Sequence, residues 1–396
     1  MLFRAVHAEQ AVATVLAEID RLGLRADVDL VGPTMRVRLL RDGTPVALGY
    51  GKGRGAQGTV SAYAEALERY LMSARDNRRF SSHNTVLLAA STVAAQPALA
   101  ADLVIQRWAA EFPAAAAACA EYHGPAGTVR YPTFLADPRY YRAPAPGDTV
   151  EPYCSLLRYS SSLGTAAGLT VTEAVYHGLC ELVEHDGLSQ ALLRWFVAGR
   201  PEVDVVEPAA LPPPLRTLHD EATAAAGASV HLLDLTTDLG VPVYLAVSGP
   251  DLLGAGASTW GSYAAERALS ELIQTSTLAG ETTGAPPADR LAAWPALQRC
   301  VLMPIDELLA GPVRSVALRG DTGDGTAADG LARAGRMLGD RGVRYHVCEL
   351  APADSLIAVA TTIAPGLERF SLVRHGVPVI PTGRGHHLWP APQPAA

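Results

Sequence analysis

The sequence predicts a protein of the α+β class with a mixed α/β core, and three observations support this prediction. Of its 396 residues 49% are apolar, which is enough to bury a large core in two or more lobes. Segments with helical periodicity alternate with short strand-like runs along the chain. Each half offers an acidic helix beside predicted β-structure, so a site is expected between the two.

The first part of the chain is expected to form a helix followed by a small sheet. Residues 7–23 carry apolar side chains at i, i+3 and i+4 spacing, which predicts a helix that ends near Gly23. Gly-Pro and Asp-Gly turns separate the next three apolar runs. These runs predict strands at residues 28–31, 35–40 and 45–48.

A glycine-rich run, residues 49–55, follows the predicted hairpin and delivers Lys52 to a helix predicted at residues 59–75. The run is not a Walker loop, because Gly53 stands where that loop has Ser or Thr. Lys52 can nevertheless meet a phosphate as a point charge. A strand is predicted next, at residues 85–88.

Two segments with unusual composition follow. Residues 97–122, with an alanine run at 114–118, have a composition that predicts helix. Residues 124–150 are rich in Pro, Gly and Tyr, which predicts a long ordered excursion over the surface. Its tyrosines are expected to pack beneath that loop, with a binding role as the alternative. They are Tyr131, Tyr140 and Tyr141.

The second half of the chain starts with a central helix, which is expected to begin at a cap on Thr170 or Thr172. Residues 191–196 are expected to extend this helix or to pack against it. Beyond them, helix and strand patterns alternate to the end of the chain. Helices are predicted at residues 212–227, 262–278 and 328–338, and strands at 230–234, 241–247 and 344–349.

Charge and cysteine content exclude several classes of protein. A net charge of −8 and the lack of a Lys/Arg-rich run argue against a nucleic-acid binder and favour a neutral or basic substrate. The five scattered cysteines indicate neither a disulfide framework nor a zinc site, and we expect reduced, mostly buried thiols. Because we find no signal peptide and no apolar stretch of about 18 residues, a cytoplasmic protein that does not enter the membrane is expected.

Two of the predicted helices each carry a pair of glutamates three residues apart, Glu65/Glu68 and Glu181/Glu184. At this spacing the carboxylates share one face, about 4.5 Å apart along the axis, and repel each other without a cation. A single pair is typical of a solvated face, but two copies allow four carboxylates to face one another. Mg²⁺ needs oxygen ligands and usually takes some from phosphate, so the pattern indicates a Mg²⁺–nucleotide site.

The residues around these pairs resemble the acidic signatures of the YcaO family. The first signature is matched by Ser61, Ala62, Glu65, Ala66, Glu68 and Arg69. The second is matched by Glu173, Ala174, Gly178, Glu181 and Glu184. Three further blocks match in the same order, at residues 234–243, 256–274 and 364–368. Together the matches run in register from about residue 45 to the end of the chain.

The resemblance implies a YcaO-type fold, with an ATP and Mg²⁺ site between helices packed on β-sheets. It implies a catalytic domain at residues 45–375, with residues 1–44 packed on this core and a proline-rich tail at 376–396 directed to the active site. Site roles carry over by motif position. Mg²⁺ is expected on Glu65, Glu68, Glu181 and Glu184, and ATP on Lys52, Ser61, Arg69, Glu173, His185 and Gln274.

The tail carries Pro390, Pro392 and Pro394, a spacing that prefers a stiff polyproline conformation. Azoline-forming members of the YcaO family end in a similar tail that is inserted toward the active site. These three prolines are therefore expected to be catalytic, with a disordered terminus as the alternative. The neighbouring His386 and His387 are expected to be exposed, and proton transfer is the alternative role.

Four positions depart from the family pattern. Leu163 and Leu169 stand where the family has asparagines, and His185 and Ser276 stand where it has arginines. The loss of amides and fixed positive charge near a triphosphate predicts weaker ATP binding. Either other basic groups compensate, or the site works only inside a complex, or it no longer works. The candidate basic groups are Arg54, Arg267 and Arg384.

The leading interpretation is an ATP-dependent cyclodehydratase subunit that forms thiazoline or oxazoline rings from Cys, Ser or Thr of a ribosomally synthesised precursor peptide. We recognise no leader-peptide-binding domain at the N-terminus, so a leader-binding partner protein is expected, and a homodimer is left open. One alternative is thioamide or amidine formation, against which the tail argues. The other is a catalytically degenerate scaffold subunit, for which the four departures argue.

Overall fold

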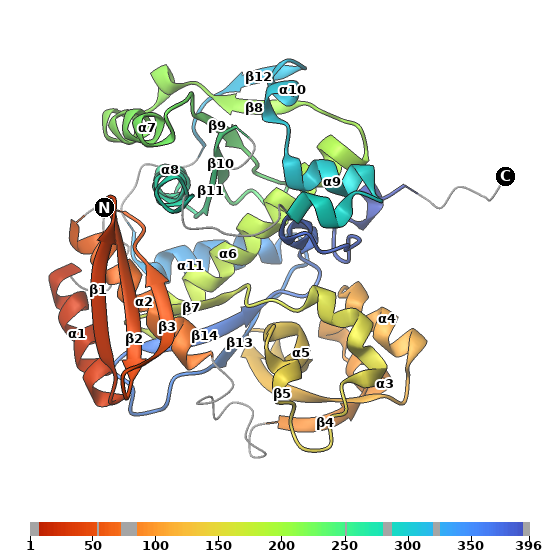
Figure 1. The fold of residues 1–396 in the computed structure, drawn as a ribbon. Coiled ribbons are helices and arrows are strands. Elements are labelled where there is room, and N and C mark those ends of the chain that lie inside the picture. The colour runs from red at the N-terminus through yellow and green to blue at the C-terminus, as the bar shows by residue number, and fades with distance from the viewer. Residues whose placement is uncertain are drawn as a thin grey trace. The chain divides into compact units, whose positions relative to one another are not determined.

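The computed structural model describes residues 8–53, 55–72, 85–249, 252–279, 287–319 and 325–390. The chain divides into two compact units. The first unit comprises Met1–Leu182 and Asp324–Pro365, and the second comprises Val183–Gly323 and Gly366–Ala396. Both units combine helices with mostly antiparallel sheets (Figure 1), so the predicted α+β class is confirmed.

The first unit contains a three-stranded sheet and a six-stranded sheet. Its strands are β1 (Arg25–Val31), β2 (Thr34–Arg41), β3 (Thr44–Tyr50), β4 (Thr85–Ala89), β5 (Ala116–Gly124), β6 (Gly127–Pro132), β7 (Thr165–Gly168), β13 (His346–Glu349) and β14 (Ala358–Ile363). Its helices are α1 (Ala8–Arg21), α2 (Gly55–Leu71), α3 (Ala90–Ala94), α4 (Leu103–Glu111), α5 (Thr133–Ala136) and α11 (Ala327–Gly339). It also contains the first part of α6 (Val171–Leu192).

The three-stranded sheet β1-β2-β3 is antiparallel, and α1 and α2 lie against it (Figure 1). Val37 and Leu39 of β2 are fully buried and join Leu67 of α2 in one apolar cluster. The alternate residue Arg38 pairs with Asp27 of β1 at 2.8 Å. This alternation of apolar and charged residues is what the sequence shows, and the predicted strands and first two helices are confirmed with small shifts at their ends.

The six-stranded sheet has the order β4-β5-β13-β14-β7, with β6 paired to β5. All of its pairings are antiparallel. Ala174 and Val175 of α6 form a small core cluster with Ala360 of β14. This packing fixes the start of α6 against the sheet.

The prediction of a helix over residues 97–122 is wrong in its second half. Helix α4 ends at Glu111, and the alanine run enters strand β5 instead. Ala117 and Ala118 pair with Leu88 and Leu87 of β4 and are 0% and 1% exposed. Their small side chains suit a tightly packed sheet, so tertiary packing overrides the helix propensity of alanine here.

The second unit is built on a five-stranded sheet with the order β11-β10-β9-β8-β12. Its strands are β8 (Val203–Val206), β9 (His231–Asp234), β10 (Val243–Ser248), β11 (Leu252–Ala257) and β12 (Val313–Val316), of which β12 pairs with β8 in parallel. Its helices are the rest of α6, α7 (Pro213–Ala226), α8 (Gly261–Leu278), α9 (Pro295–Leu302) and α10 (Ile305–Leu309). Helices α7 and α8 lie beside the sheet (Figure 1). Helix α8 can approach β11 closely because Gly254 has no Cβ, which would stand 2.2 Å from the Ala268 oxygen.

Several smaller predictions are also decided by the fold. Helix α6 continues into one π-helical turn at Leu193–Val197, as expected for an extension of the central helix. Tyr131 and Tyr140 pack beneath the 124–150 segment with 3% and 0% exposure, whereas Tyr141 is 48% exposed. Of the five cysteines three are buried, and burial raises the pKa of the Cys119 and Cys300 thiols to about 12. Within the residues that the structure describes, a helix with the length and apolar character needed to span a membrane is not found.

Candidate functional site

The loop that carries Lys52 is held tightly against the start of α2. A Cβ on Gly51 would stand 2.4 Å from the Gly58 oxygen, and one on Gly49 would stand 2.2 Å from the Ala62 oxygen. Only glycine permits this approach. The glycine-rich run therefore allows β3 to pack closely against α2. Lys52 lies partly buried in the loop between these two elements.

Glu65 and Arg69 form a local polar group on α2. The Glu65 carboxylate accepts a hydrogen bond from the Tyr50 amide at 2.8 Å and pairs with Arg69 at 2.5 Å. Arg69 also donates to the Leu48 carbonyl at 2.9 Å. These contacts tie α2 to β3, and the Arg69 side chain is 44% exposed.

Glu68 lies on α2 close to two other carboxylates. Burial raises its pKa well above the ordinary value, and the neighbouring Glu181 and Glu65 raise it further. Arg69 and the amide of Ala167 oppose these effects without reversing them. Glu68 of α2 therefore lies within electrostatic reach of Glu65 on its own helix and of Glu181 on α6, and Arg69 offsets part of this repulsion.

Glu181 is fixed by a close packing of α6 on the loop before β7. A Cβ on Gly178 would stand 2.3 Å from the Gly164 oxygen, and Gly164 itself adopts a φ of +82°. One turn after Gly178, the Glu181 carboxylate accepts a hydrogen bond from the Gly164 amide at 3.0 Å. Gly178 of the second signature and Gly164 thus bring Glu181 close to the backbone, and Glu181 lies within electrostatic reach of Glu68.

These side chains have the chemistry of a site for a hard cation. Carboxylate oxygens suit Mg²⁺, and a cation among them would relieve the mutual repulsion that raises the pKa of Glu68. Among the described residues, however, the structure holds no group of three or more His, Cys, Asp or Glu side chains that is already arranged to bind a metal. The residues fit a site that Mg²⁺ completes together with phosphate oxygens, rather than an all-protein cage.

Glu173, predicted to support ATP, has a local structural role. Thr170 caps α6 by accepting the Glu173 amide at 3.2 Å, and the Glu173 carboxylate accepts the Leu169 amide at 2.9 Å. This reciprocal arrangement resembles a capping box, except that Glu173 accepts the amide of Leu169 rather than that of the cap residue Thr170. Glu173 is 2% exposed. Of the two predicted caps, Thr170 is the correct one.

The remaining predicted nucleotide and metal residues lie on α2 or in the second unit. Ser61 is partly buried on α2. Glu184, His185 and Gln274 belong to the second unit, and Glu184 and Gln274 are 7% and 8% exposed. The His185 Nδ1 lies 2.9 Å from the Ser371 Oγ. Glu184 is buried, and Glu65, Glu68 and Glu181 are partly buried. This burial does not fit a solvated acidic face.

Two of the four departures from the family pattern make local contacts. Leu169 packs against the apolar cluster beneath the three-stranded sheet. Ser276 donates to the Leu272 carbonyl of its own helix at 2.8 Å. Arg384, one candidate for a compensating cation, is paired with Asp186 and Asp238.

Part of the predicted tail lies outside the described residues. Pro390 is exposed, as are His386 and His387. Pro392 and Pro394 lie beyond the last described residue, and Arg54, another candidate cation, lies in a gap.

A model of the YcaO family, described as a YcaO cyclodehydratase that binds ATP and Mg²⁺, matches residues 50–368. The chain belongs to the YcaO family. The resemblance stated from the sequence is therefore confirmed, and the expected cofactors, ATP and Mg²⁺, are those of the family description.

Solved structures agree with this YcaO assignment at the level of the fold. YcaO from Methanopyrus kandleri, bound with AMPPCP and Mg²⁺, is 20% identical with a TM-score of 0.65 over 96% of each chain. A heterocyclase in complex with substrate and cofactor is 19% identical with a TM-score of 0.63 over 92% of this chain and 53% of that one. The E. coli microcin synthetase McbBCD complex with pro-MccB17 bound contains a chain that is 14% identical, with a TM-score of 0.58 over 87% of this chain and 88% of that one.

A curated relative matches a shorter part of the YcaO chain. An uncharacterised protein in the tfuA 3′ region of Rhizobium leguminosarum bv. trifolii is 41% identical over 90 residues. These residues are 23% of this chain and 21% of that protein. The match thus spans about a fifth of that relative.

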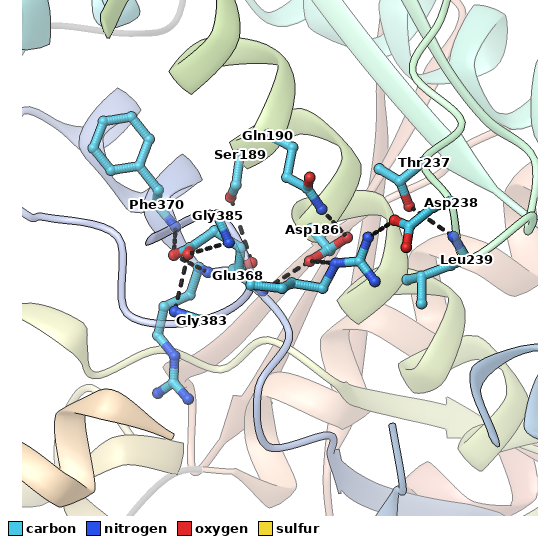
Figure 2. A network of polar contacts seen from close by, with 12 residues as sticks. Asp186, Ser189, Gln190, Thr237, Asp238, Leu239, Glu368, Phe370, Gly383 and Gly385 are labelled. Atoms are coloured by element: carbon cyan, nitrogen blue, oxygen red, sulfur yellow. Dashed lines mark hydrogen bonds and ion pairs between the residues drawn. The ribbon is translucent and has the colours of Figure 1, made fainter. Parts of the chain in front are cut away.

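The structure also contains a polar network that the sequence did not predict. It joins Asp186, Glu368 and Arg384 in the second unit. Asp186 and Glu368, which Figure 2 labels, are 0% and 2% exposed, and the Arg384 side chain is 18% exposed. Glu368 ends the last matched sequence block, and Arg384 stands between two glycines. The available signal was Glu368 followed by the run Gly383-Arg384-Gly385. The two lie about 15 residues apart, and sequence patterns do not predict a contact over that separation.

Proposed function

We propose that this YcaO protein is an ATP-dependent cyclodehydratase that forms thiazoline or oxazoline rings in a ribosomally synthesised precursor peptide. The observation that carries the proposal is the placement of Glu68 on α2 within electrostatic reach of Glu65 and of Glu181 on α6, and burial together with these like charges raises the pKa of Glu68. A protein keeps so unfavourable a group of like charges where a cation is to be bound. Family membership supplies the class of reaction.

The proposed reaction begins with the side chain of the peptide residue that becomes the ring. Its thiol or hydroxyl attacks the carbonyl carbon of the preceding residue and releases its proton. The carbonyl oxygen becomes an oxyanion and attacks the γ-phosphorus of ATP. The phosphoryl group is transferred to this oxygen, and ADP is the leaving group. Loss of phosphate, with departure of the amide proton, forms the C=N bond. Each ring therefore lowers the peptide mass by one water.

The protein groups act by position and charge. Bound Mg²⁺ would neutralise charge that develops on the phosphate oxygens. The proposed Mg²⁺ ligands are Glu65, Glu68, Glu181 and Glu184. The proposed ATP contacts are Lys52, Ser61, Arg69, Glu173, His185 and Gln274, and the tail prolines Pro390, Pro392 and Pro394 are proposed to act on the peptide. For Glu173 and His185, the capping contact and the Ser371 contact would have to coexist with ATP.

The proposal is tested by ATP hydrolysis and peptide mass with Mg²⁺, a candidate precursor peptide and its leader-binding protein. We expect loss of one water per modified residue, and a fall of at least about 100-fold in both readouts for Glu181→Gln. The exposed Glu9→Gln on α1 is the matched control and should leave both unchanged. Wild-type turnover by Glu181→Gln would contradict the site assignment. Exchange of oxygen for sulfur, or addition of an amine, would support the thioamide or amidine alternative.

A second candidate function is a scaffold subunit without turnover. The observation in its favour is that Leu169 packs into the core and Ser276 bonds its own helix, so neither replaces the family's amide or arginine. A scaffold would bind a catalytic partner and leave ATP intact. Replacing Leu169 by Asn and Ser276 by Arg would then be expected to create ATP hydrolysis where the unmodified chain has none.

The proposed partners are the precursor peptide and a leader-binding protein, and the proposed location is the cytoplasm. A homodimer is a further arrangement, which light scattering of the purified chain would decide. Co-purification of the chain with a leader-binding protein from the same gene neighbourhood would support the complex. Full activity of the chain alone would contradict partner dependence.

A further inference from the structure

Glu368 lies at the centre of a cradle of backbone amides. It is 2% exposed, and its two carboxylate oxygens accept five backbone N–H groups at distances of 2.9 to 3.1 Å. The donors are Arg369, Phe370, Thr382, Gly383 and Gly385, several of which are drawn in Figure 2. One side chain thereby joins its own turn to a segment about 15 residues later.

The glycines in the later segment are required by this geometry. A Cβ on Gly383 would stand 2.5 Å from the Leu367 oxygen, and one on Gly385 would stand 2.6 Å from the Leu193 Cδ1. The amide of Arg384, between them, donates to the Gly366 carbonyl at 2.9 Å. The backbone of residues 382–385 is therefore wrapped around the Glu368 carboxylate.

Arg384 points away from that carboxylate and joins two others. Its Nε lies 3.3 Å from the Asp186 Oδ1, and its second guanidinium nitrogen donates to Asp238. Asp186 is fully buried and also accepts the Glu368 amide at 2.9 Å and the Gln190 amide group at 2.9 Å. Asp186 of α6 thus contacts both the Glu368 backbone and the side chain of Arg384 in the wrapped segment. Figure 2 shows Asp186 beside Glu368.

A second row of contacts runs beside the first. The Ser189 Oγ accepts the Ser371 amide at 2.8 Å and donates to the Glu368 carbonyl at 3.4 Å. The His185 Nδ1 lies 2.9 Å from the Ser371 Oγ. The segment after residue 385 then makes a short helical turn, His386–Leu388, and Trp389 packs edge-on against Phe370 with ring centroids 6.0 Å apart.

We propose that Glu368, Asp186 and Arg384 are positioning residues that fix residues 382–389, and through them the start of the proline-rich tail, for the reaction. The proposal rests on the proposed function in that the tail is taken to act on the peptide. Buried charges add little net stability compared with apolar packing, but they specify one geometry. The network contacts the segment that leads to Pro390. It is therefore suited to fixing the position of residues 382–389 rather than to raising the overall stability of the fold.

The first test is amide hydrogen exchange in the full chain with Glu368→Gln. We expect exchange at Thr382, Gly383 and Gly385 to accelerate about 10- to 100-fold, because each loses a hydrogen bond to a charged acceptor. Glu207→Gln, at an exposed glutamate of the same unit, is the matched control and should change nothing there. If Glu368→Gln does not fold, Arg384→Gln takes its place, since Arg384 is partly exposed. Unchanged exchange in the folded variant overturns the proposal whatever the activity.

The second test separates positioning from folding by a double-mutant cycle on peptide modification. Arg384→Gln and removal of residues 391–396 are measured alone and together. If Arg384 acts through the tail, the double variant loses no more than the worse single variant, and Arg384→Lys restores part of the rate. Additive losses overturn the positioning role. If the unmutated chain modifies no peptide, the proposed function fails, and exchange at residues 382–385 still decides whether these residues fix the segment.

Discussion

Two groups of carboxylates in this protein differ in how their charge is compensated. The described partners of Glu65, Glu68 and Glu181 in the first unit include Arg69 and the backbone amides of Tyr50, Ala167 and Gly164, one amide for each carboxylate. Glu368 in the second unit has five amides to itself. The first group brings like charges together, whereas both oxygens of Glu368 accept backbone amides.

The causes of the pKa shifts make the same distinction. Burial raises the pKa of Glu68, and the neighbouring carboxylates add to that effect. Burial also raises the pKa of Glu368 and that of Asp186, the latter to about 6, but there backbone amides and arginine oppose it. Raised pKa values alone therefore do not distinguish a binding site from a structural network. What distinguishes them is whether the neighbours are like charges or donors.

Substitution in the second group should have the largest effect on stability. Glu368→Gln places an NH₂ group against several of the five amides, and we expect the free energy of unfolding to fall by about 3 kcal/mol, given about 1–3 kcal/mol for each buried donor left unpaired. Urea unfolding followed by circular dichroism measures this difference, with Glu207→Gln as control. An unchanged midpoint would mean that the amide cradle contributes no stability.

The matching substitution in the first group should have the opposite sign. Glu68→Gln removes a like charge, and we expect the metal-free protein to gain about 0.5–2 kcal/mol, the usual range for relief of strain at a functional site. The pKa of Glu68 is raised in the folded state, so its contribution to stability is complete below the ordinary value of 4.5 and is lost as the pH rises through the raised value. The gain should therefore grow from acid to neutral pH. A loss of stability at neutral pH would contradict the comparison.

The pH dependence of Asp186 gives a smaller, well-defined effect. Its pKa is raised from 3.8 to about 6 by burial, against the opposing effect of Arg384. Between these two values the folded state holds the proton more tightly, so stability should decrease as the pH rises from about 4 to about 6. Asp186→Asn should flatten that slope, as measured by unfolding at several pH values, whereas the exposed Asp289→Asn should keep it. A slope that persists in Asp186→Asn would show that other groups cause it.

The smallest effect is expected at Arg69. Its side chain is 44% exposed, so Arg69→Gln should lower stability by no more than about 0.5 kcal/mol. Its effect on Glu68 should be clearer, because loss of the opposing cation raises the pKa of Glu68 further. Thermal unfolding and carboxyl-resolved NMR titration would measure the two effects. A fall in the pKa of Glu68 in this variant would contradict the stated cause.

The sequence predicted the fold and the first carboxylate group far better than the second. Glutamates at a spacing of three residues report on helix faces, and Gly49 and Gly51 mark close approach of the strand to α2, so local pattern carries that information. The contact of Glu368 with residues 382–385 depends on how two loops meet, which no periodicity encodes. The alanine run was misassigned because Ala117 and Ala118 follow sheet packing rather than helix propensity.

The central claim is that Glu68 and its neighbours form a cation site rather than a structural network. Calorimetric titration of a non-hydrolysable ATP analogue with Mg²⁺ into the unmodified chain and into Glu68→Gln tests it most directly. We predict binding to the unmodified chain and a loss of at least about 100-fold in affinity for the variant, although the variant remains folded and is no less stable. Equal affinity of the two proteins would contradict the account.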